Sequence, residues 1–273
     1  MTSREPTLID SHVHLQDPAF ADDLEQVLSR ASQARIEKMI INGTKETDWL
    51  RAARIGSLPG CRCCFGLHPW FVPDRSDMWE TNLNRVLDAY PAVGIGEIGL
   101  DRWIEPRDES AQEEVFRRQL AIARERDLPV MVHCLRAWGW LMDVLRGEDP
   151  LERGMLIHAY GGPAEMLEEF ADMGAYFSFA GNVLEPKRKK AREALAAVPA
   201  ERLLIETDAP DMPPPERFGP HNRPREDEDA ARNEPANLSA IAEGIAGIRD
   251  ENTDELAERT TQNAREFFGA RLD

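Results

Sequence analysis

Short apolar runs alternate with longer amphipathic stretches along the whole chain. The runs are hydrophobic at consecutive positions, as is typical of strands buried on both faces of a parallel sheet. The amphipathic stretches carry apolar residues on one side of a helical repeat, which predicts helices that cover the sheet. We expect strands at 7–10, 38–42, 61–67, 92–98, 129–132, 154–158, 175–180 and 203–207.

Helices are expected between these strands and after the last one. Repeated βα units with short connections imply a parallel sheet, and eight of them close most naturally into a barrel. The sequence therefore predicts an α/β fold, a TIM (β/α)8 barrel, formed as a single domain by residues 1–273. The expected helices are 22–34, 46–55, 78–89, 110–128, 138–146, 163–173, 187–198, 235–248 and 254–268.

Two local features add detail to this prediction. Ser110 and Glu113 have the spacing of a capping box, so a helix should begin at Ser110. Residues 209–234 contain six prolines and few apolar residues. A loop of this length in a compact domain is more often functional than ordinary. Because it directly follows the last strand, it should arch over the mouth of the barrel.

Side chains that bind metal ions stand at the ends of five apolar runs. The strands of a parallel barrel end at one face, where barrel enzymes carry their catalytic residues. Imidazoles and carboxylates gathered there would bind two divalent ions, and zinc, manganese and magnesium all suit these ligand types. The candidate metal ligands are His12, His14, Glu97, His133, His158 and Asp208.

The first run carries Asp10, His12 and His14 at alternate positions. Alternate residues of a strand share one face, so both imidazoles can reach one ion while Asp10 orients one of them. A His-x-His pair alone is equally compatible with two structural histidines. However, four of only six histidines in the chain stand at such strand ends, which favours a metal site.

Two carboxylates complete the candidate set. A carboxylate on an inner strand is costly to bury unless it is paired or bound to a metal. Glu97 lies among glycines that permit a bulge or a close backbone approach, and its carboxylate can bridge two ions. Asp208 is preferred over Glu206 as a ligand because it lies nearer the end of its strand.

The formal net charge of −17 limits the classes of partner. It disfavours broad binding to duplex DNA, but a small phosphate-bearing substrate stays compatible because bound cations reverse the local field. No apolar stretch reaches the roughly 18 residues of a membrane span, and the first residues lack a signal-peptide pattern. We therefore expect a cytoplasmic protein with no membrane partner.

Four cysteines are present, three of them in one short segment. A structural zinc site usually takes four ligands from two paired clusters, and a second cluster is missing here. We expect buried, reduced thiols, with Cys61 and Cys63 on one face of a strand and Cys64 on the other. Cys134 would point away from the metal because it directly follows His133. Reduced cysteines fit a reducing compartment.

Seven motifs, in order along the chain, together resemble the TatD family of metal-dependent hydrolases, the TatD-type deoxyribonucleases. The resemblance implies a TIM barrel of the amidohydrolase-like class with a two-metal centre. It also implies action on DNA, because the family's characterised members act largely as deoxyribonucleases with 3′→5′ exonuclease action. The motifs are DSHVH at 10–14, GLHP at 66–69, GEIGLD at 96–101, VHC at 132–134, IHAY at 157–160, ETDAP at 206–210 and RNEP at 232–235.

The same resemblance divides the ligands between two ions. A water activated by the ions would attack the phosphodiester, with Asp208 as the general base and Glu97 as the bridge between the ions. Asp208 and Glu97 are therefore the catalytic candidates. One ion would be held by His12, His14, Glu97 and Asp208, and the second by Glu97, His133 and His158.

Residues near the strand ends are candidates for substrate binding. His68 and Arg136 would stabilise charge on the phosphoryl oxygens, although His68 is equally compatible with a structural role in a turn. Four tryptophans would either stack on the bases of a single strand or a frayed end, or pack in the ordinary way. They are Trp70, Trp103, Trp138 and Trp140.

Three functions stay open at this point. The first is a phosphodiesterase, most simply a deoxyribonuclease acting on DNA, an oligonucleotide or another small phosphodiester. The second is a metal-dependent hydrolase of an amide or ester bond in a small molecule, which the acidic surface favours. The third is a metal-binding protein without catalysis, which the intact ligand set and candidate base disfavour. The sequence predicts neither the oligomeric state nor the polarity of cleavage.

Overall fold

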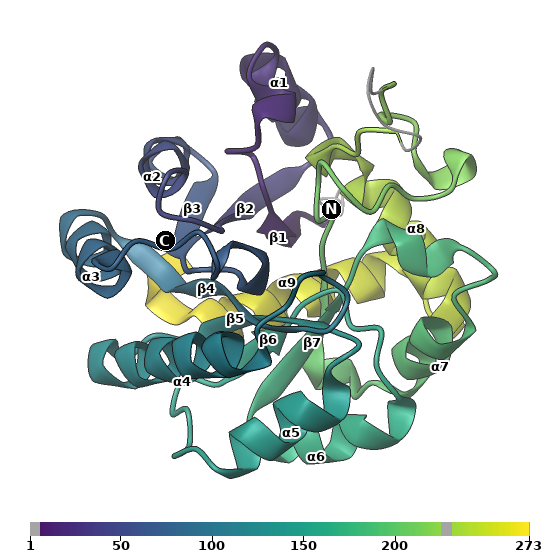
Figure 1. The fold of residues 1–273 in the computed structure, drawn as a ribbon. Coiled ribbons are helices and arrows are strands. Elements are labelled where there is room, and N and C mark those ends of the chain that lie inside the picture. Colours follow the sequence, from purple (N-terminus) through teal and green to yellow (C-terminus); the bar gives the residue numbers. More distant parts are fainter. Residues whose placement is uncertain (1–5, 225–230, 273) are drawn as a thin grey trace.

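Eight parallel strands form the centre of the protein, and each strand pairs with the next one in the sequence (Figure 1). The computed structural model describes residues 6–224 and 231–272. This strand order confirms the predicted TIM barrel. The strands are β1 (Leu8–Val13), β2 (Ile36–Gly43), β3 (Cys61–Phe65), β4 (Ala92–Asp101), β5 (Val130–Leu135), β6 (Met155–Ile157), β7 (Ala175–Phe179) and β8 (Leu203–Ile205).

Helices surround the barrel and pack their apolar faces on the strands (Figure 1). They occur where the sequence predicts them, with ends that differ by a few residues. Within the described residues, no helix combines the length and the apolar character that crossing a membrane requires. The helices are α1 (Leu24–Gln33), α2 (Trp49–Gly56), α3 (Trp79–Ala89), α4 (Glu109–Arg126), α5 (Trp138–Arg146), α6 (Leu167–Asp172), α7 (Lys189–Ala197), α8 (Leu238–Arg249) and α9 (Thr253–Phe268).

The predicted start of α4 at Ser110 is wrong. Asp108 caps the helix instead, and its carboxylate accepts a hydrogen bond from the N–H of Ala111 at 2.9 Å. A carboxylate at the cap also adds a negative charge at the positive end of the helix dipole. This favours capping by Asp108 over capping by the Ser110 hydroxyl.

Helix α9 closes one end of the barrel. Inner side chains of seven strands form a buried cluster that Phe267 and Phe268 of α9 join. In five strands the cluster residue precedes the candidate ligand by two to four positions. The helix therefore covers the end opposite the ligands and leaves the carboxyl ends of the strands accessible. The strand residues in the cluster are Ile9, Ile40, Cys64, Val93, Met131, Leu156 and Leu204.

The barrel closes where β1 meets the segment after β8. The N–H of Asp208 donates to the carbonyl of His12 at 3.0 Å, and the N–H of His14 donates to the carbonyl of Ala209 at 2.8 Å. These bonds join the beginning of the barrel to its end. They also bring three of the predicted ligands to one place.

The proline-rich segment after β8 begins at the mouth of the barrel, as expected. Asp211 and Met212 line the cavity there, whereas residues 225–230 of the predicted loop lie outside the described residues. The segment ends against α1, where the buried Glu234 accepts hydrogen bonds from Arg30 at 2.7 and 2.8 Å. Arg232 donates to the same carboxylate at 2.9 Å. This ion-pair network fixes the end of the segment.

All four cysteines are buried, and none is in a disulfide. Cys61 and Cys63 pack among the helices, whereas Cys64 points into the barrel. The predicted alternation of these side chains in β3 is confirmed.

Candidate metal centre

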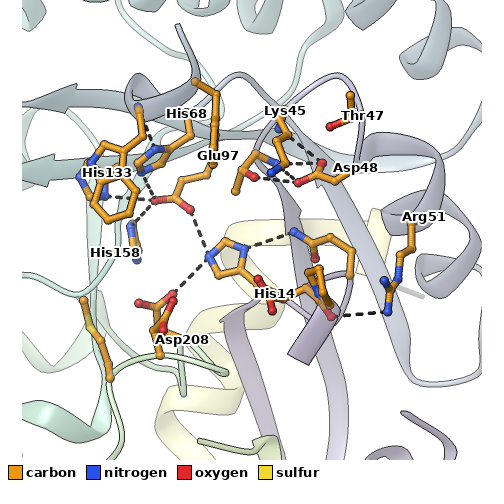
Figure 2. Close-up of a pocket in the computed structure, with 18 of the residues that line it drawn as sticks. His14, Lys45, Thr47, Asp48, Arg51, His68, Glu97, His133, His158 and Asp208 are labelled. Atoms are coloured by element: carbon orange, nitrogen blue, oxygen red, sulfur yellow. Dashed lines mark hydrogen bonds and ion pairs between the residues drawn. The ribbon is translucent and has the colours of Figure 1, made fainter. Parts of the chain in front are cut away.

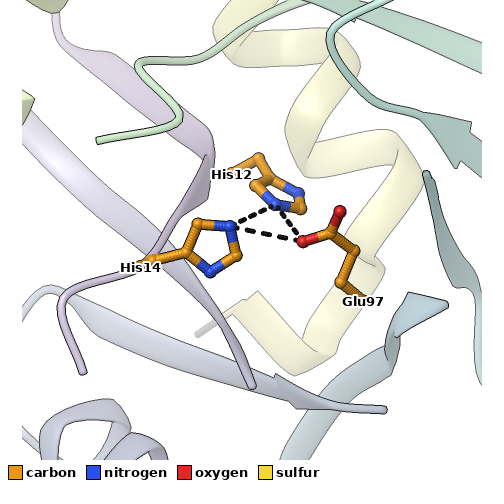
Figure 3. Close-up of side chains that lie close together, drawn as sticks. All are labelled: His12, His14 and Glu97. Atoms are coloured by element: carbon orange, nitrogen blue, oxygen red, sulfur yellow. Dashed lines mark hydrogen bonds and ion pairs between the residues drawn. The ribbon is translucent and has the colours of Figure 1, made fainter. Parts of the chain in front are cut away.

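Three side chains form a compact polar cluster at the carboxyl ends of β1 and β4 (Figure 3). The Nε2 atoms of His12 and His14 are 3.2 Å apart. Oε2 of Glu97 lies 3.2 Å from Nε2 of His12 and 3.3 Å from Nε2 of His14. Ligand atoms bound about 2.1 Å from a tetrahedral ion lie roughly 3.4 Å from one another. The three atoms are therefore spaced as the ligands of one ion would be.

Asp208 brings a fourth ligand atom to this cluster. Its Oδ1 lies 3.3 Å from Nε2 of His14 and 3.7 Å from Nε2 of His12. This oxygen is buried and has no hydrogen-bond partner among the described residues. An unpaired buried carboxylate oxygen is costly, and a bound cation would relieve that cost. The donor set thus fits a divalent ion.

The other oxygen of Glu97 faces a second group of imidazoles. Oε1 of Glu97 lies 2.8 Å from Nε2 of His158, 3.1 Å from Nδ1 of His133 and 3.2 Å from Nε2 of His68. Nε2 of His158 has no well-aligned hydrogen bond among the described residues. The two oxygens of one carboxylate therefore face two separate sets of nitrogen atoms, which is the arrangement of a bridging ligand.

The backbone around Glu97 departs from a regular strand. The register between β4 and β5 shifts between Ile95 and Ile98, on either side of Glu97. Gly99 has a φ of 148°, and a Cβ there would lie 2.0 Å from the carbonyl oxygen of His133. The irregularity and the close approach that the glycines permit are therefore both present.

Burial and charge set the protonation states in the cluster. Burial alone would raise the pKa of Glu97, but His158, His68 and His12 hold that pKa well below its usual range. Burial lowers the pKa of His68 to about 4, although Glu97 opposes this effect. Burial also lowers the pKa of His12.

Burial would lower the pKa of the other three imidazoles as well, but the carboxylates outweigh it. Asp208 and Glu97 raise the pKa of His14 well above the usual range, and Glu97 does the same to the pKa of His158. Asp101 raises the pKa of His133. The cluster therefore offers an anionic carboxylate among imidazoles that would release protons on binding a metal ion.

A hydrogen bond to the outer ring nitrogen orients His14. Nδ1 of His14 donates to the carbonyl of Asn42 at 2.9 Å, which leaves the lone pair of Nε2 directed at Glu97 and Asp208. Ligand histidines in metal sites are commonly fixed in this way.

Asp101 orients His133, a role that the sequence did not indicate. Its carboxylate is fully buried and accepts a hydrogen bond from Nε2 of His133 at 2.8 Å, which leaves Nδ1 facing Glu97. The same carboxylate accepts the indole N–H of Trp70 at 2.8 Å and the backbone N–H groups of residues 103 and 104. Burial would raise the pKa of Asp101, but these donors, led by His133, lower it to about 2. The one available signal was its position at the end of the GEIGLD motif.

Glu206 lies beside His158, although sequence reasoning favoured Asp208 alone. Oε1 of Glu206 is 3.5 Å from Nδ1 of His158 and accepts the N–H of Ala159 at 2.7 Å. The hydroxyl of Ser178 donates to its other oxygen. Glu206 also forms a compact group of potential ligand atoms with His12 and His158. The ETDAP motif thus contributes two carboxylates to the centre.

The expectation that Asp10 orients a histidine ring is wrong. Its carboxylate accepts hydrogen bonds from the hydroxyl of Thr207 at 2.5 Å and from the N–H of Thr207 at 2.9 Å. A longer bond of 3.4 Å comes from the backbone N–H of His12. Nδ1 of His12 is buried without a hydrogen-bond partner among the described residues. The carboxylate faces β8 across the barrel closure, so Asp10 ties the backbones of the two strands together.

A cavity of about 580 Å³ opens above the cluster (Figure 2). Glu97, Asp208 and the imidazoles of His14, His68, His133 and His158 line it. His12 lies deeper and has no exposed surface. A volume of this size is typical of a small-molecule site. The remaining wall includes Lys45, Thr47, Asp48 and Arg51 from the segment that follows β2.

His68 and Trp70 stand together at the cavity wall. Nδ1 of His68 accepts the backbone N–H of Trp70 at 3.1 Å, so the neutral ring carries its proton on Nε2. That nitrogen is a donor beside Glu97. The indole of Trp70 lines the cavity and is 43% exposed although its N–H is held by Asp101, so part of the ring is accessible.

The remaining predicted substrate residues lie elsewhere. Arg136 is exposed and does not line the cavity, because its guanidinium stacks on the ring of Trp103 at 4.0 Å. Trp140 donates its indole N–H to Glu113, and the ring of Trp138 packs 4.7 Å from that of Tyr160. Packing thus accounts for the positions of Trp138 and Trp140.

A TIM barrel whose strand ends gather imidazoles and carboxylates around an accessible cavity defines the class of the protein. It is a metal-dependent hydrolase, as the sequence predicts. A family model described as TatD related DNase matches residues 9–269. The chain belongs to the TatD family.

Individual relatives agree with this assignment. The chain is 34% identical to an uncharacterized metal-dependent hydrolase, YabD, of Bacillus subtilis, with 96% of this chain and 98% of YabD aligned. It is 36% identical to the 3′-5′ ssDNA/RNA exonuclease TatD of Pantoea ananatis, over 96% and 99% of the two chains. Among solved structures, the TatD homologue YjjV of Escherichia coli superposes with a TM-score of 0.87 at 29% identity, covering 96% of this chain and 98% of YjjV.

Proposed function

We propose that this chain is a divalent-metal-dependent 3′→5′ exonuclease that acts on single-stranded or frayed nucleic acid. The observation that carries the proposal is the carboxylate of Glu97, whose two oxygens face two sets of imidazoles beneath an accessible cavity. Two ions about 4 Å apart are the usual device for hydrolysing phosphodiesters. The exonuclease relatives over nearly the whole chain support the same substrate class.

We propose that six side chains would hold two metal ions. Zinc, manganese and magnesium are all compatible with nitrogen and carboxylate donors. Bound divalent ions would lower the pKa of a water molecule and polarise a phosphoryl oxygen, which makes the phosphorus atom easier for that water to attack. One ion would be held by His12, His14, Glu97 and Asp208, and the second by Glu97, His133 and His158.

Three side chains would act directly on the substrate. Burial raises the pKa of Asp208, but His14, His158 and His12 hold it below its usual range, so the carboxylate is ionised. Asp208 would therefore take the proton of the attacking water. Nε2–H of His68 would donate to a phosphoryl oxygen. The exposed part of the Trp70 ring would stack on a base, which favours unpaired strands.

Metal analysis combined with oligonucleotide digestion tests the proposal. Glu97→Ala should lose at least one ion per chain and most of the nuclease activity. Glu243→Ala, which removes an exposed carboxylate on α8, should retain both. Unchanged metal content in Glu97→Ala would refute the bridging role. Intact oligonucleotides together with hydrolysis of small amides or esters would select the alternative hydrolase.

We also propose a reducing compartment, the cytoplasm, as the place of action. Burial raises the pKa of Cys61 to about 11 and that of Cys63 to about 12, so these thiols stay protonated and unreactive near neutral pH. Buried cysteines that form no disulfide are typical of cytosolic proteins.

A further inference from the structure

We propose that Lys45 and Arg51 form a phosphate-binding subsite beside the metal centre. The subsite would take the phosphodiester next to the one that is cleaved. This inference rests on the proposed exonuclease function and specifies how the polynucleotide would lie. It would run from the metal centre toward the segment between β2 and α2.

The two cations share one cavity with the metal centre. Lys45 follows β2, Arg51 lies in the first turn of α2, and both line the cavity that Glu97 and His14 also line. Figure 2 shows Lys45 and Arg51 on the side of the cavity away from His133. A ligand bound at the cluster would therefore extend toward these side chains.

Neither cation is neutralised by a neighbour. Among the described residues, no carboxylate oxygen lies within 4.0 Å of Lys45 or Arg51. The ammonium of Lys45 lies 4.4 Å from the centre of the Phe71 ring. Arg51 has one long hydrogen bond of 3.4 Å, to the backbone carbonyl of Asp17. Both side chains are partly buried and line the cavity, so their charges are available to a ligand there.

The nearby acidic side chains are already engaged. The carboxylate of Asp48 accepts the N–H and the hydroxyl of Thr44 at 3.1 and 2.7 Å. It also accepts the N–H of Lys45 at 3.4 Å. The carboxylate of Asp17 accepts the N–H of Ala19 at 2.8 Å. Both carboxylates therefore form hydrogen bonds within their own loops and no ion pair with Lys45 or Arg51. The two cations remain available to bind an anion.

Gln16 provides an independent sign of a ligand in the same place. Its side chain is 4% exposed and lines the cavity, yet its Oε1 has no hydrogen-bond donor among the described residues. The amide nitrogen donates to the carbonyl of Asn42 at 2.6 Å, which fixes which end of the amide is the acceptor. Buried acceptors are rarely left unpaired. A sugar hydroxyl or a base N–H of the bound nucleotide would satisfy it.

The chemistry of the pair suits a phosphodiester. Arginine presents a fork of donors that matches phosphate oxygens, and lysine adds a point charge. The metal ions would neutralise the phosphate under attack, so these two cations are left for its neighbour. In a chain of net charge −17, a local pair of cations is also needed to hold a second phosphate near the centre.

The test compares the double variant Lys45→Gln/Arg51→Gln with the control variant Arg54→Gln. Arg54 lies in the same helix but is exposed and does not line the cavity. Removing each cation should raise KM for a short oligonucleotide roughly tenfold, the value of one charge-assisted hydrogen bond. The effect on the oligonucleotide should exceed the effect on bis(p-nitrophenyl) phosphate, which has one phosphate, at least tenfold. The slope of log KM against log salt should fall by about 0.7 for each cation that is removed.

A substrate change sharpens the comparison. An oligonucleotide with a neutral methylphosphonate next to the cleaved diester should bind the wild-type protein as weakly as the normal strand binds the double variant. The two changes combined should add little, because they remove the same interaction. Fluorescence anisotropy with a labelled phosphorothioate strand gives the affinities without turnover.

The outcomes separate the two proposals. If the wild-type protein cleaves neither phosphodiester, the exonuclease function itself fails. If it cleaves both and the double variant behaves like Arg54→Gln on the oligonucleotide, the subsite is refuted while the function stands. Additive losses for the variant and the methylphosphonate would also refute the subsite.

Discussion

Replacing Asp101 by Asn should weaken the metal centre without removing a ligand. The Asp101 carboxylate collects four N–H donors, two on each oxygen, and one of them is Nε2 of His133. An asparagine side chain has one acceptor oxygen, so its NH2 end must face two N–H groups that it cannot bind. The ring of His133 is then free to rotate, or the turn after β4 loses its anchor.

The magnitude follows from these hydrogen bonds. Two hydrogen bonds to a charged group, each worth about 1.5–3 kcal/mol, disappear on substitution. We expect the metal-free variant to be destabilised by about 3 kcal/mol or more. Loss of a carboxylate that orients a ligand histidine typically lowers metal affinity 10- to 100-fold, or about 1.4–2.7 kcal/mol. One ion should be affected more than the other, because Asp101 contacts His133 alone among the predicted ligands.

Competition with a chromophoric chelator measures the metal affinities, and urea unfolding of the metal-free protein measures the stability separately. Trp70→Phe is the matched control, because it removes the indole donor to Asp101 and keeps the hydrogen bond with His133. It should weaken metal binding much less than Asp101→Asn does. If Asp101→Asn binds both ions as tightly as the wild-type protein, Asp101 does not position His133 and its assigned role is refuted.

Three further predictions concern stability. Glu234→Gln should lower the free energy of unfolding by about 3 kcal/mol in urea titrations, because the neutral amide leaves Arg30 and Arg232 without their buried counter-charge. Gly99→Ala should cost more than about 4 kcal/mol or prevent folding, as judged by circular dichroism, because its Cβ would overlap the carbonyl of His133. Removing bound metal with a chelator should lower the melting temperature in calorimetry, since an ion at 1,000 times its Kd stabilises the folded state by about 4 kcal/mol.

Each of these has its own control. Glu243→Gln changes an exposed side chain and should stay within about 0.5 kcal/mol of the wild-type protein. Gly139→Ala adds a Cβ in open space on helix α5, so it should be neutral or stabilise the protein by up to about 1 kcal/mol. Equal losses for Glu234→Gln and Glu243→Gln would show that the ion-pair network contributes nothing specific. A chelator effect that persists in Glu97→Ala at full size would show that the metal stabilises the chain from another site.

The barrel and the gathering of the ligands could be predicted because both follow from local patterns. Apolar runs indicate buried strands, and parallel strands that close into a barrel must present their ends at one face. His12 and Asp208 therefore had to meet once their strands were recognised, and their side chains lie 3.7 Å apart. The resemblance of the motifs added the division of the ligands between two ions.

The surroundings of the ligands could not be predicted, because they depend on side chains that meet across different strands. Asp101 lies within a recognised motif, but its partners Trp70 and His133 come from the segments after β3 and within β5. Arg136 has a left-handed backbone with a φ of 57° and stacks on Trp103, and a non-glycine residue does not reveal this conformation in the sequence. Lys45 directly precedes the predicted helix 46–55, where the sequence gives no sign of a functional residue.

The hydrogen bonds that close the barrel make the metal centre sensitive to partial unfolding. His12 and His14 come from the first strand and its end, whereas Asp208 comes from the segment that follows the last strand. A local opening that separates these two parts of the chain would therefore take a ligand away from the others while the rest of the barrel stays folded.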